Sequence, residues 1–548
     1  MSHSILAGDR RFGPLAFWGG VLAVALGVAA HLPGAVDAAH HGGVPMCSAG
    51  AMDGIFGAPM DVMMLIGMAL IVGGTIAAGY GLLPKASGQA ARPAKRVISS
   101  FQGNMTRAHW ELALVLIIAV IIDVMKPATL GFVMPGMARE YGLSRPQVAL
   151  LPFVALTGTA VGSCIWGLLA DRFGRRATIL LAAILFVGTS ICGAMPSFGW
   201  NLVMCFLMGL PAGGMLPIAF TLLSEVAPAR HRGWLLVMLG GLALAGGYLA
   251  ASGAATVLEP IYGWRVLWLL GLPTGLALIA LNTRIPELPS FLLLHGRTDE
   301  FNRVMARFNL TPARDADAPS LSAEFDRPSG KPRVFGPPML NMSIALNLMA
   351  VIWGLVNFGL LLWMPTELQA RGLGMAEANA LLAKSSLYAL PISVVAAALY
   401  QWWGGKRLLV LLALVTALGL CLLGAWDQAG SWIGASPIQL IALVMIGSNG
   451  MIAVMLPYCA ESYPSVIRGQ ATGFVAGASK FGGIGAQIAT LAGAVPAVAA
   501  AALVLAVPMA FSALLVARYG RRTDAGEGPR TAFPGGGLDA AIGEARAA

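Results

Sequence analysis

Charged residues are scarce in this chain. They make up 11% of its 548 residues, whereas about 25% is usual for a soluble domain. Hydrophobic side chains account for 57% of the chain. A balance so poor in charge excludes a large water-soluble protein, and it predicts a polytopic membrane protein instead.

The sequence also lacks paired cysteines and familiar catalytic motifs. Its six cysteines include no CxxC pair, so no disulfide framework, redox motif or zinc knuckle is indicated. No HExxH, GxSxG or phosphate-binding loop occurs in a credible setting. We therefore expect neither an enzyme nor a bound cofactor. The net charge of +10 does not indicate nucleic acid, because the basic residues cluster beside the ends of apolar runs.

Long apolar runs are abundant: fourteen of them reach the length of about 18 residues that is needed to cross a bilayer. Two come before residue 85, at Pro14–Leu32 and Met60–Leu83. The other twelve form two groups of six: Glu111–Ala138, Val148–Ala170, Ala177–Met195, Asn201–Glu225, Gly233–Val257 and Trp264–Thr283, then Met339–Glu367, Ala378–Trp402, Leu408–Trp426, Ile438–Ala460, Gly469–Leu491 and Val495–Val516.

These runs divide the chain into six regions. They are a two-helix membrane extension (1–84), a basic linker (85–110), a first six-helix bundle (111–283), a polar loop (284–338), a second six-helix bundle (339–518) and a disordered tail (519–548). Basic residues mark every second loop, so both termini are expected in the cytoplasm. Arg10 and Arg11 before the first run, with Val36-Asp-Ala38 after it, leave a cleaved secretory signal as an alternative to an anchor helix.

One motif occurs twice with identical spacing. Glu225-x-x-Pro-x-x-x-Arg232 in the first half recurs as Glu461-x-x-Pro-x-x-x-Arg468 in the second, which indicates an internal duplication. The loop Gly-Leu-Leu-Ala-Asp-Arg-Phe-Gly-Arg-Arg, residues 167–176, lies between two apolar runs of the first half. Its acidic and first basic residues are replaced by tryptophans at positions 402 and 403, so this loop is degenerate in the second half.

Both motifs resemble the loop signatures of the major facilitator superfamily of transporters. The resemblance implies an all-α integral membrane fold with twelve core helices in two bundles, here preceded by two further membrane helices. It also implies that the motif residues stabilise one state of an alternating-access cycle at the cytoplasmic face. These candidate gate residues are Gly167, Asp171, Arg172, Gly174, Arg175, Arg176, Glu225, Arg232, Glu461 and Arg468.

Three ionisable residues fall near the middle of predicted spans: Asp123, Lys126 and Lys480. Such residues cost at least about 2.5 to 3.5 kcal/mol at the bilayer centre, so they are usually paired, wetted or functional. Asp123 and Lys126 are three residues apart and can share a helix face, which allows a structural ion pair. Pro127 follows at once and leaves a backbone carbonyl free, as in the broken helices of transporter substrate sites.

Sugar porters and aromatic acid:proton symporters of the same superfamily are similar here. Their first core helix carries Asp-x-x-Asp where this chain has Asp123-Val-Met-Lys126, and their eleventh carries Arg-x-Gly-Gly where this chain has Lys480-Phe-Gly-Gly. The surplus positive charge suits an anionic substrate bound by the two lysines, with Asp123 as the proton carrier. Other candidate polar residues of this site are Thr129, Asn357, Tyr388, Asn449 and Gln487, each of which could equally join helices.

We therefore expect a monomeric secondary transporter of the inner membrane that couples a small organic anion, such as a carboxylate, to protons. A hexose is disfavoured, because the fifth and seventh core runs offer few amides and hydroxyls. A non-transporting sensor on the same fold is one alternative. Another is a transition-metal transporter whose N-terminal extension offers soft ligands, namely His31, His40, His41, Met46 and Cys47.

Overall fold

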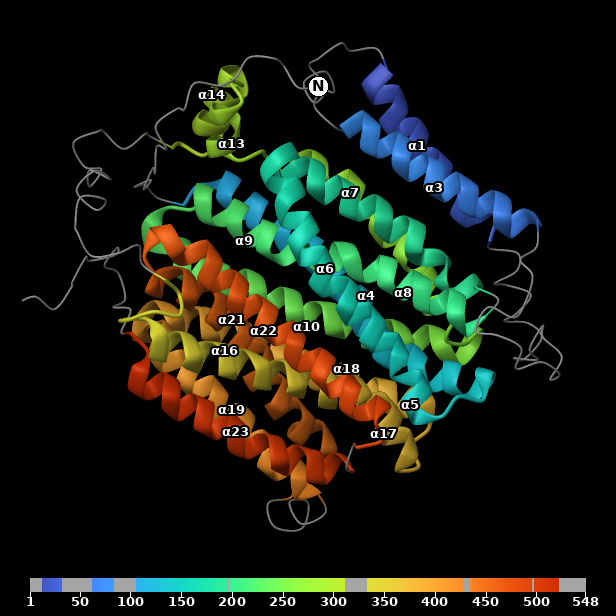
Figure 1. The fold of residues 1–548 in the computed structure, drawn as a ribbon, viewed down its shortest axis with the longest axis vertical. Helices are drawn as coiled ribbons and strands as arrows, with labels where there is room; N and C mark the ends of the chain where they lie inside the picture. The colour runs from blue at the N-terminus through green and yellow to red at the C-terminus, as the bar shows by residue number, and fades with distance from the viewer. Residues whose placement is uncertain are drawn as a thin grey trace, which may run out of the picture.

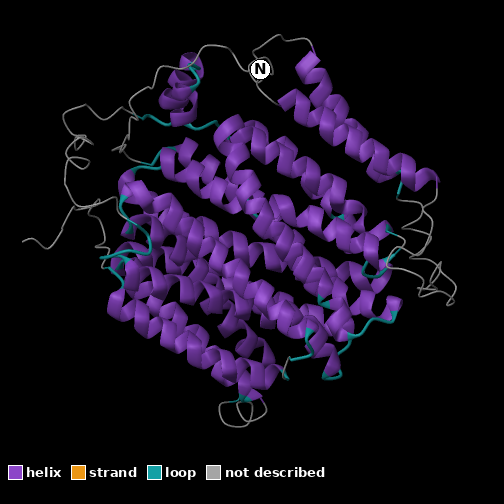
Figure 2. Cartoon of the chain, in the orientation of Figure 1, coloured by secondary structure: helices purple, strands orange, loops and turns teal. Residues whose placement is uncertain are grey.

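The computed structural model describes residues 12–31, 62–82, 105–195, 197–310, 333–426, 434, 436–494 and 497–521. This part of the chain is helical and contains no strand (Figure 2). Twelve of its helices are long and apolar enough to cross a membrane. The predicted all-α integral membrane fold is confirmed. Most of the basic linker, the middle of the polar loop and the end of the tail lie outside the described residues.

The first bundle contains six membrane-crossing units, several of them broken into shorter helices (Figure 1). Long unbroken helices form its first and fifth units. The units are α4 (Arg107–Tyr141), α5 (Arg145–Val148) with α6 (Leu150–Phe173), α7 (Arg175–Gly188) with η1 (Thr189–Ala194), α8 (Phe198–Ala212) with α9 (Met215–Val226), α10 (Ala229–Tyr262), and α11 (Val266–Leu269) with α12 (Gly271–Leu281) and η2 (Asn282–Arg284).

The second bundle repeats this order. Its units are α16 (Leu340–Gly354) continued by η3 (Leu355–Leu360), η4 (Leu361–Trp363) and α17 (Met364–Ala370), then α18 (Met375–Trp403), α19 (Gly405–Gly424), α21 (Pro437–Ser462), α22 (Ser465–Leu491) and α23 (Val498–Tyr519). Two short helices of the connecting loop, α13 (Pro289–Leu294) and α14 (Thr298–Arg307), lie at one end of the first bundle (Figure 1). We call this end, where Arg175, Arg230 and Arg407 begin or precede helices, the basic end.

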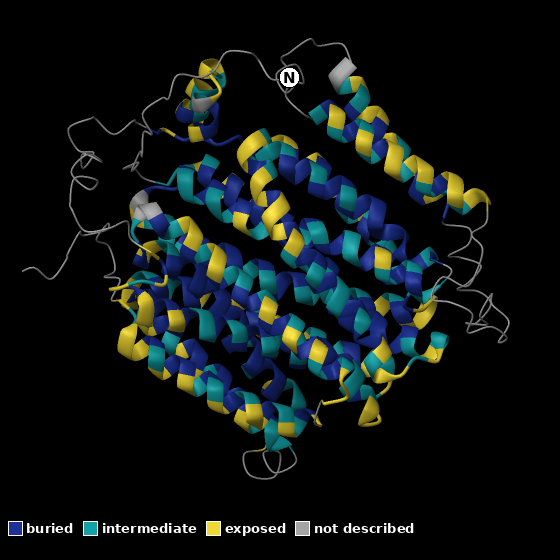
Figure 3. Ribbon diagram, in the orientation of Figure 1, coloured by how far each residue is buried: buried dark blue, intermediate teal, exposed yellow. Residues whose placement is uncertain are grey.

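The two bundles meet along two pairs of helices. α10 packs along α18, and α6 packs against α22. The first pair is in contact over its whole length, since Tyr400 lies against Gly233 at the basic end and Asn379 binds Glu259 at the other. Buried residues fill the interior of both bundles, while exposed ones follow the outer faces of the helices (Figure 3).

The N-terminal extension consists of α1 (Phe12–Ala29) and α3 (Val62–Leu82), which pack against each other and against α7 on the outside of the first bundle. Of the two, α3 is long and apolar enough to span a membrane, whereas the apolar part of α1 covers only Pro14–Ala29. α22 is also missing from the twelve apolar helices, because Arg468, Lys480 and Gln487 make it more polar than its neighbours. A second spanning helix in the extension stays a prediction.

Candidate functional site

Two buried groups of opposite charge face each other from the two bundles. Asp123 lies on α4 with 3% of its surface exposed, and its Oδ1 atom is buried without a hydrogen-bond partner. Lys480 lies on α22 and is partly buried. The two charges attract each other, although the structure places no ion pair within 4.0 Å between these two residues. The sequence names both residues as candidates without pairing them, and their role in transport stays a prediction.

Lys126 is turned away from this pair. Its Nζ donates a hydrogen bond of 2.6 Å to the backbone carbonyl of Phe186 and lies 5.6 Å from the centre of the Phe186 ring. Phe186 is on α7, so the side chain of Lys126 is directed into the interior of the first bundle. The structural ion pair that the spacing of Asp123 and Lys126 allows is not formed, because the ammonium is bonded to a carbonyl near the end of α7 instead. The contact of Lys126 with a substrate stays a prediction.

The helix opposite Asp123 is irregular at the same depth. α16 passes into η3, a π-helical segment, and this change of hydrogen bonding leaves side chains and carbonyls free for other contacts. Phe358 of this segment places its ring 5.1 Å from Nζ of Lys480. Its carbonyl accepts a 2.7 Å hydrogen bond from Nε2 of Gln487, whose Oε1 accepts from Nε1 of Trp363 at 3.2 Å. Sequence reasoning found Gln487 but missed Phe358, because an aromatic residue in an apolar run carries no distinguishing signal.

A small void of about 10 Å³ lies beside Phe358. Its walls come from both bundles: Pro127 and Thr159 from the first, Phe358 and Leu362 from the second. The void adjoins Pro127, the proline of α4 that the sequence singled out, so this proline and the π-helical segment lie on the walls of the same void. A cavity of this size has room for about one water molecule, so side chains nearly fill the space between the bundles at this point.

The remaining predicted polar residues fall into two groups. Thr129, Asn449 and Gln487 are buried, and Asn357 is partly buried on η3. Tyr388 is 59% exposed and lies on the same outer stripe of α18 as Leu387 and Val394. Thr129 donates to the carbonyl of Met125 at 2.8 Å, a bond within its own helix. The structure thus places Gln487 on the same helix as Lys480 and bonds it to Phe358, the neighbour of Asn357, whereas Tyr388 lies on an outer face.

At the basic end, the duplicated motif residues meet across the two bundles. Glu225, Arg232, Glu461 and Arg468 interact electrostatically, and the Nε atoms of both arginines are buried without a hydrogen-bond partner. Glu461 also accepts a 2.7 Å hydrogen bond from the hydroxyl of Tyr400. The prediction that the two copies of the motif lie at one face is in agreement with this geometry.

Asp171 is bonded to an arginine of its own motif. Its Oδ1 accepts from Nη2 of Arg175 at 2.8 Å within the same loop, and its side chain is 73% exposed. Glu225 instead accepts from Ser290 of α13 with both oxygens, each at 2.9 Å. Gly174 adopts φ +96, a conformation that suits glycine. Of the other loop residues, Gly167 and Arg172 are exposed and Arg176 is partly buried.

The polar loop contributes a carboxylate that the sequence did not single out as a gate residue. Glu287 is 8% exposed and accepts from the backbone N–H groups of Arg175 at 2.8 Å and Arg176 at 3.2 Å, at the first turn of α7. Burial raises the pKa of Glu287 above its ordinary value, although these backbone hydrogen bonds and the nearby Arg175 act in the opposite direction. The loop is thereby fastened to the first bundle through the amides at a helix start.

The opposite end holds a buried hydrogen bond between the bundles. Glu259 of α10 is 6% exposed and accepts a 2.6 Å hydrogen bond from Nδ2 of Asn379 on α18. The sequence gives no signal for this contact, since Glu259 lies near the end of an apolar run. Lys384 is an exposed lysine inside α18.

The candidate metal ligands are not assembled in the described part of the chain. His31 is 1% exposed, with Nδ1 hydrogen-bonded to the carbonyl of Gly27 at 2.7 Å. His40, His41, Met46 and Cys47 lie outside the described residues. Within those ranges no group of three or more His, Cys, Asp or Glu residues could hold a metal ion.

Known proteins share this architecture and its sequence pattern. The model of the Major Facilitator Superfamily matches residues 115–487. The niacin transporter NiaP of Acinetobacter baylyi is 26% identical over 390 residues, which cover 69% of this chain and 86% of that protein. The 4-hydroxybenzoate transporter PcaK of Pseudomonas putida is 28% identical over 395 residues, which cover 70% and 86%.

A solved structure agrees at the level of the fold. The proton:xylose symporter XylE bound to 6-bromo-6-deoxy-D-glucose superimposes with a TM-score of 0.61 at 19% identity, over 76% of this chain and 97% of that one. Its identity is too low to carry more than the fold. With the duplicated motifs, the two bundles and the match over most of the chain in agreement, the chain belongs to the Major Facilitator Superfamily, and the relatives named here are transporters, not enzymes.

Proposed function

We propose that this protein carries a small aromatic monocarboxylate across the inner membrane together with protons. The observation that supports this is the placement of Asp123 and Lys480, one from each bundle, where their charges interact, with Lys480 beside the π-helical segment η3. Alternating access separates and rejoins the two bundles, so a charge pair divided between them is remade in each cycle. The names of NiaP and PcaK, transporters of aromatic acids, point to the same substrate class.

Lys480 is the group that we assign to the substrate carboxylate. A lysine on the site side of α22 gives a charge-assisted hydrogen bond to an anion, which is stronger than a neutral one. The ring of Phe358, 5.1 Å from Nζ of Lys480, offers an apolar face to an aromatic ring held by the same ammonium. Gln487 fixes the backbone of Phe358 and so keeps this face in place.

Asp123 is the group that we assign to the proton. Its carboxyl group is buried and its Oδ1 atom has no hydrogen-bond partner. When the substrate carboxylate binds Lys480, this lysine no longer stabilises an ionised Asp123, so the carboxyl group takes up a proton. When the substrate leaves, Lys480 is again free to attract the ionised carboxylate. Substrate and proton would therefore bind together and leave together, as symport requires.

The test is uptake of radiolabelled nicotinate and 4-hydroxybenzoate by proteoliposomes with an imposed pH gradient. Lys480→Gln should raise the apparent dissociation constant at least about tenfold, since a charge-assisted contact contributes on the order of 1.5 to 3 kcal/mol. Lys384→Gln, at an exposed lysine of α18, is the matched control and should behave as wild type. Absence of uptake for every aromatic monocarboxylate tried would refute the substrate class.

Coupling is tested separately with Asp123→Asn. This variant should lose accumulation driven by the pH gradient but retain exchange of labelled for unlabelled substrate, because exchange requires no net proton movement. If gradient-driven accumulation persisted in Asp123→Asn, the proton would have to be carried by another group, and the assignment of Asp123 would be wrong.

A further inference from the structure

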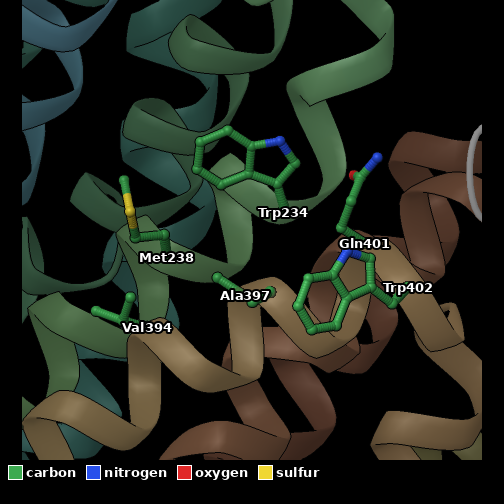
Figure 4. Close-up of a pocket in the computed structure, with 7 residues that line it drawn as sticks. Trp234, Met238, Val394, Ala397, Gln401 and Trp402 are labelled. Carbon is green, nitrogen blue, oxygen red and sulfur yellow. The ribbon is translucent and has the colours of Figure 1, made fainter.

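A groove of about 280 Å³ lies between α10 and α18 near the basic end. Figure 4 shows it walled by Trp234 and Met238 on one side and by Val394, Ala397 and Trp402 on the other, with Gln401 beside the tryptophans. Its walls are almost entirely apolar. One wall belongs to the first bundle and the other to the second, so the groove crosses the seam between them. It is separate from the Asp123–Lys480 site.

The groove opens on the outer face of the helices. Val394 and Trp402 lie on a stripe of α18 that also carries Leu387, and these side chains are 49%, 72% and 58% exposed. On α10, Trp234 and Met238 are partly exposed, while their neighbours Leu235 and Val237 are completely buried. Exposed apolar side chains on a membrane-crossing helix face lipid. The groove is therefore open to the hydrocarbon of the bilayer.

The end of the groove has the character of a membrane interface. Trp234 and Trp402 are amphipathic rings of the kind that gather at the level of lipid headgroups. Arg230 is exposed and lies one helical turn before Trp234, on the same face of α10, because residues four apart stand above one another. Gln401 adds an amide at the corresponding level of α18. The apolar groove thus has a cation and an amide at its basic end.

We propose that this groove is a binding site for one anionic phospholipid, whose acyl chain fills the slot and whose phosphate lies beside Arg230 and Gln401. The apolar walls match a hydrocarbon chain, and the cation above them matches a negative headgroup better than a zwitterionic one. A single chain of lipid would then contact both bundles at their seam.

The acyl chain is tested by photo-crosslinking in nanodiscs with phosphatidylglycerol that carries a diazirine in its acyl chain, followed by peptide mapping. Crosslinks should map to the segments 234–238 and 394–402. Ala398→Trp fills the groove and should remove them, whereas Val395→Trp, at an exposed residue of α18 that does not line the groove, should keep them. Both variants are first checked for a single peak in size-exclusion chromatography. Equal labelling in the two variants would overturn the proposal.

The headgroup is tested by competition with unlabelled lipids. Phosphatidylglycerol should displace the probe better than phosphatidylcholine does. Arg230→Gln should weaken this preference about fivefold, since a basic side chain near an anionic surface contributes about 1 kcal/mol. Arg518→Gln, at an exposed arginine near the end of α23, should leave it unchanged. Equal competition by the two lipids in the wild type would also overturn the proposal, whatever the outcome of the transport assays.

Discussion

Three charged residues near the bilayer centre have three different surroundings. Asp123 is buried with an unpaired oxygen, Lys480 lies over the ring of Phe358, and Lys126 is bonded to the carbonyl of Phe186 inside the first bundle. Because an intramembrane charge is costly unless it is satisfied, these surroundings separate residues that can work in transport from one that joins helices. The bond of Lys126 joins α4 to α7, so we expect a structural role for it in place of the substrate contact that the sequence predicts.

The role of Lys126 is testable through Lys126→Met. We expect the apparent dissociation constant of the substrate to stay within about twofold of wild type, unlike in Lys480→Gln. The effects of Lys126→Met and Asp123→Asn on thermal unfolding should add, because Lys126 is bonded to the carbonyl of Phe186 and neither variant removes a contact of the other residue. Rescue of Lys126→Met by Asp123→Asn would show that the two charges pair after all.

The burial of Glu287 predicts that docking of the polar loop on the first bundle depends on pH. Because burial raises its pKa above the ordinary value of 4.5, the protonated form is favoured in the docked state. Docking of α13 and α14 should therefore be strongest below the ordinary pKa and weaken as the pH rises through the raised value. Hydrogen exchange of residues 289–307, measured from pH 4 to pH 8, should show faster opening at the higher values.

The control for this pH dependence is Glu287→Gln, which cannot titrate but keeps one carbonyl oxygen for the amides of Arg175 and Arg176. At low pH this variant should dock about as well as the wild type, because its neutral amide, like the protonated carboxyl group, has one carbonyl oxygen as acceptor. The opening of residues 289–307 in Glu287→Gln should not depend on pH. A slope equal to that of the wild type would assign the pH dependence to another group.

At the scale of single elements, the sequence predicts most boundaries because apolar runs and turn residues set them. The sequence does not predict where a helix is interrupted within a span. The residues of Leu355–Leu360 give no signal of a π-helical segment. The carbonyl of Phe358 in this segment is bonded to Gln487 of α22, a residue that is distant in the sequence. The sequence also does not predict the direction of the Lys126 side chain. Residues three apart share a helix face, but only the packed bundle shows that the carbonyl of Phe186 is the acceptor.

The extension offers an element-scale prediction. α1 and α3 approach closely through glycines spaced seven residues apart, Gly20 and Gly27 on one helix and Gly67 and Gly74 on the other. A Cβ atom on Gly74 would lie 2.6 Å from the carbonyl oxygen of Gly20, which is too close. Gly74→Leu should therefore separate the two helices.

Disulfide trapping measures this separation. In a background without the native cysteines, a pair at Val24 and Ile71, side chains that face each other near Gly188 of α7, should crosslink readily and do so much less with Gly74→Leu. Gly73→Leu is the matched control, because a Cβ atom there meets no atom within 4 Å. Equal loss of crosslinking in both variants would mean that the glycines of α3 do not set the helix spacing.

The whole molecule is held closed at both ends. At the basic end the duplicated motif residues meet, and at the opposite end Glu259 binds Asn379. The duplication in the sequence predicts the first of these contacts, since equivalent loops of two repeats come to the same face. It cannot predict the second, because Glu259 and Asn379 are not equivalent in the two halves and only the packing of α10 along α18 joins them.

A pair of cysteines at Glu259 and Asn379 tests whether this contact must open in each cycle. If the bundles separate at this end, a disulfide between the two positions should abolish uptake in proteoliposomes, and reduction should restore it, because a covalent bond holds one state of the cycle. The single variants Glu259→Cys and Asn379→Cys control for loss of the hydrogen bond alone. They should transport at a rate that oxidation does not change. Uptake that continued at the wild-type rate in the fully oxidised double variant would show that α10 and α18 stay together at this end throughout transport, and that the bundles part elsewhere, along α6 and α22.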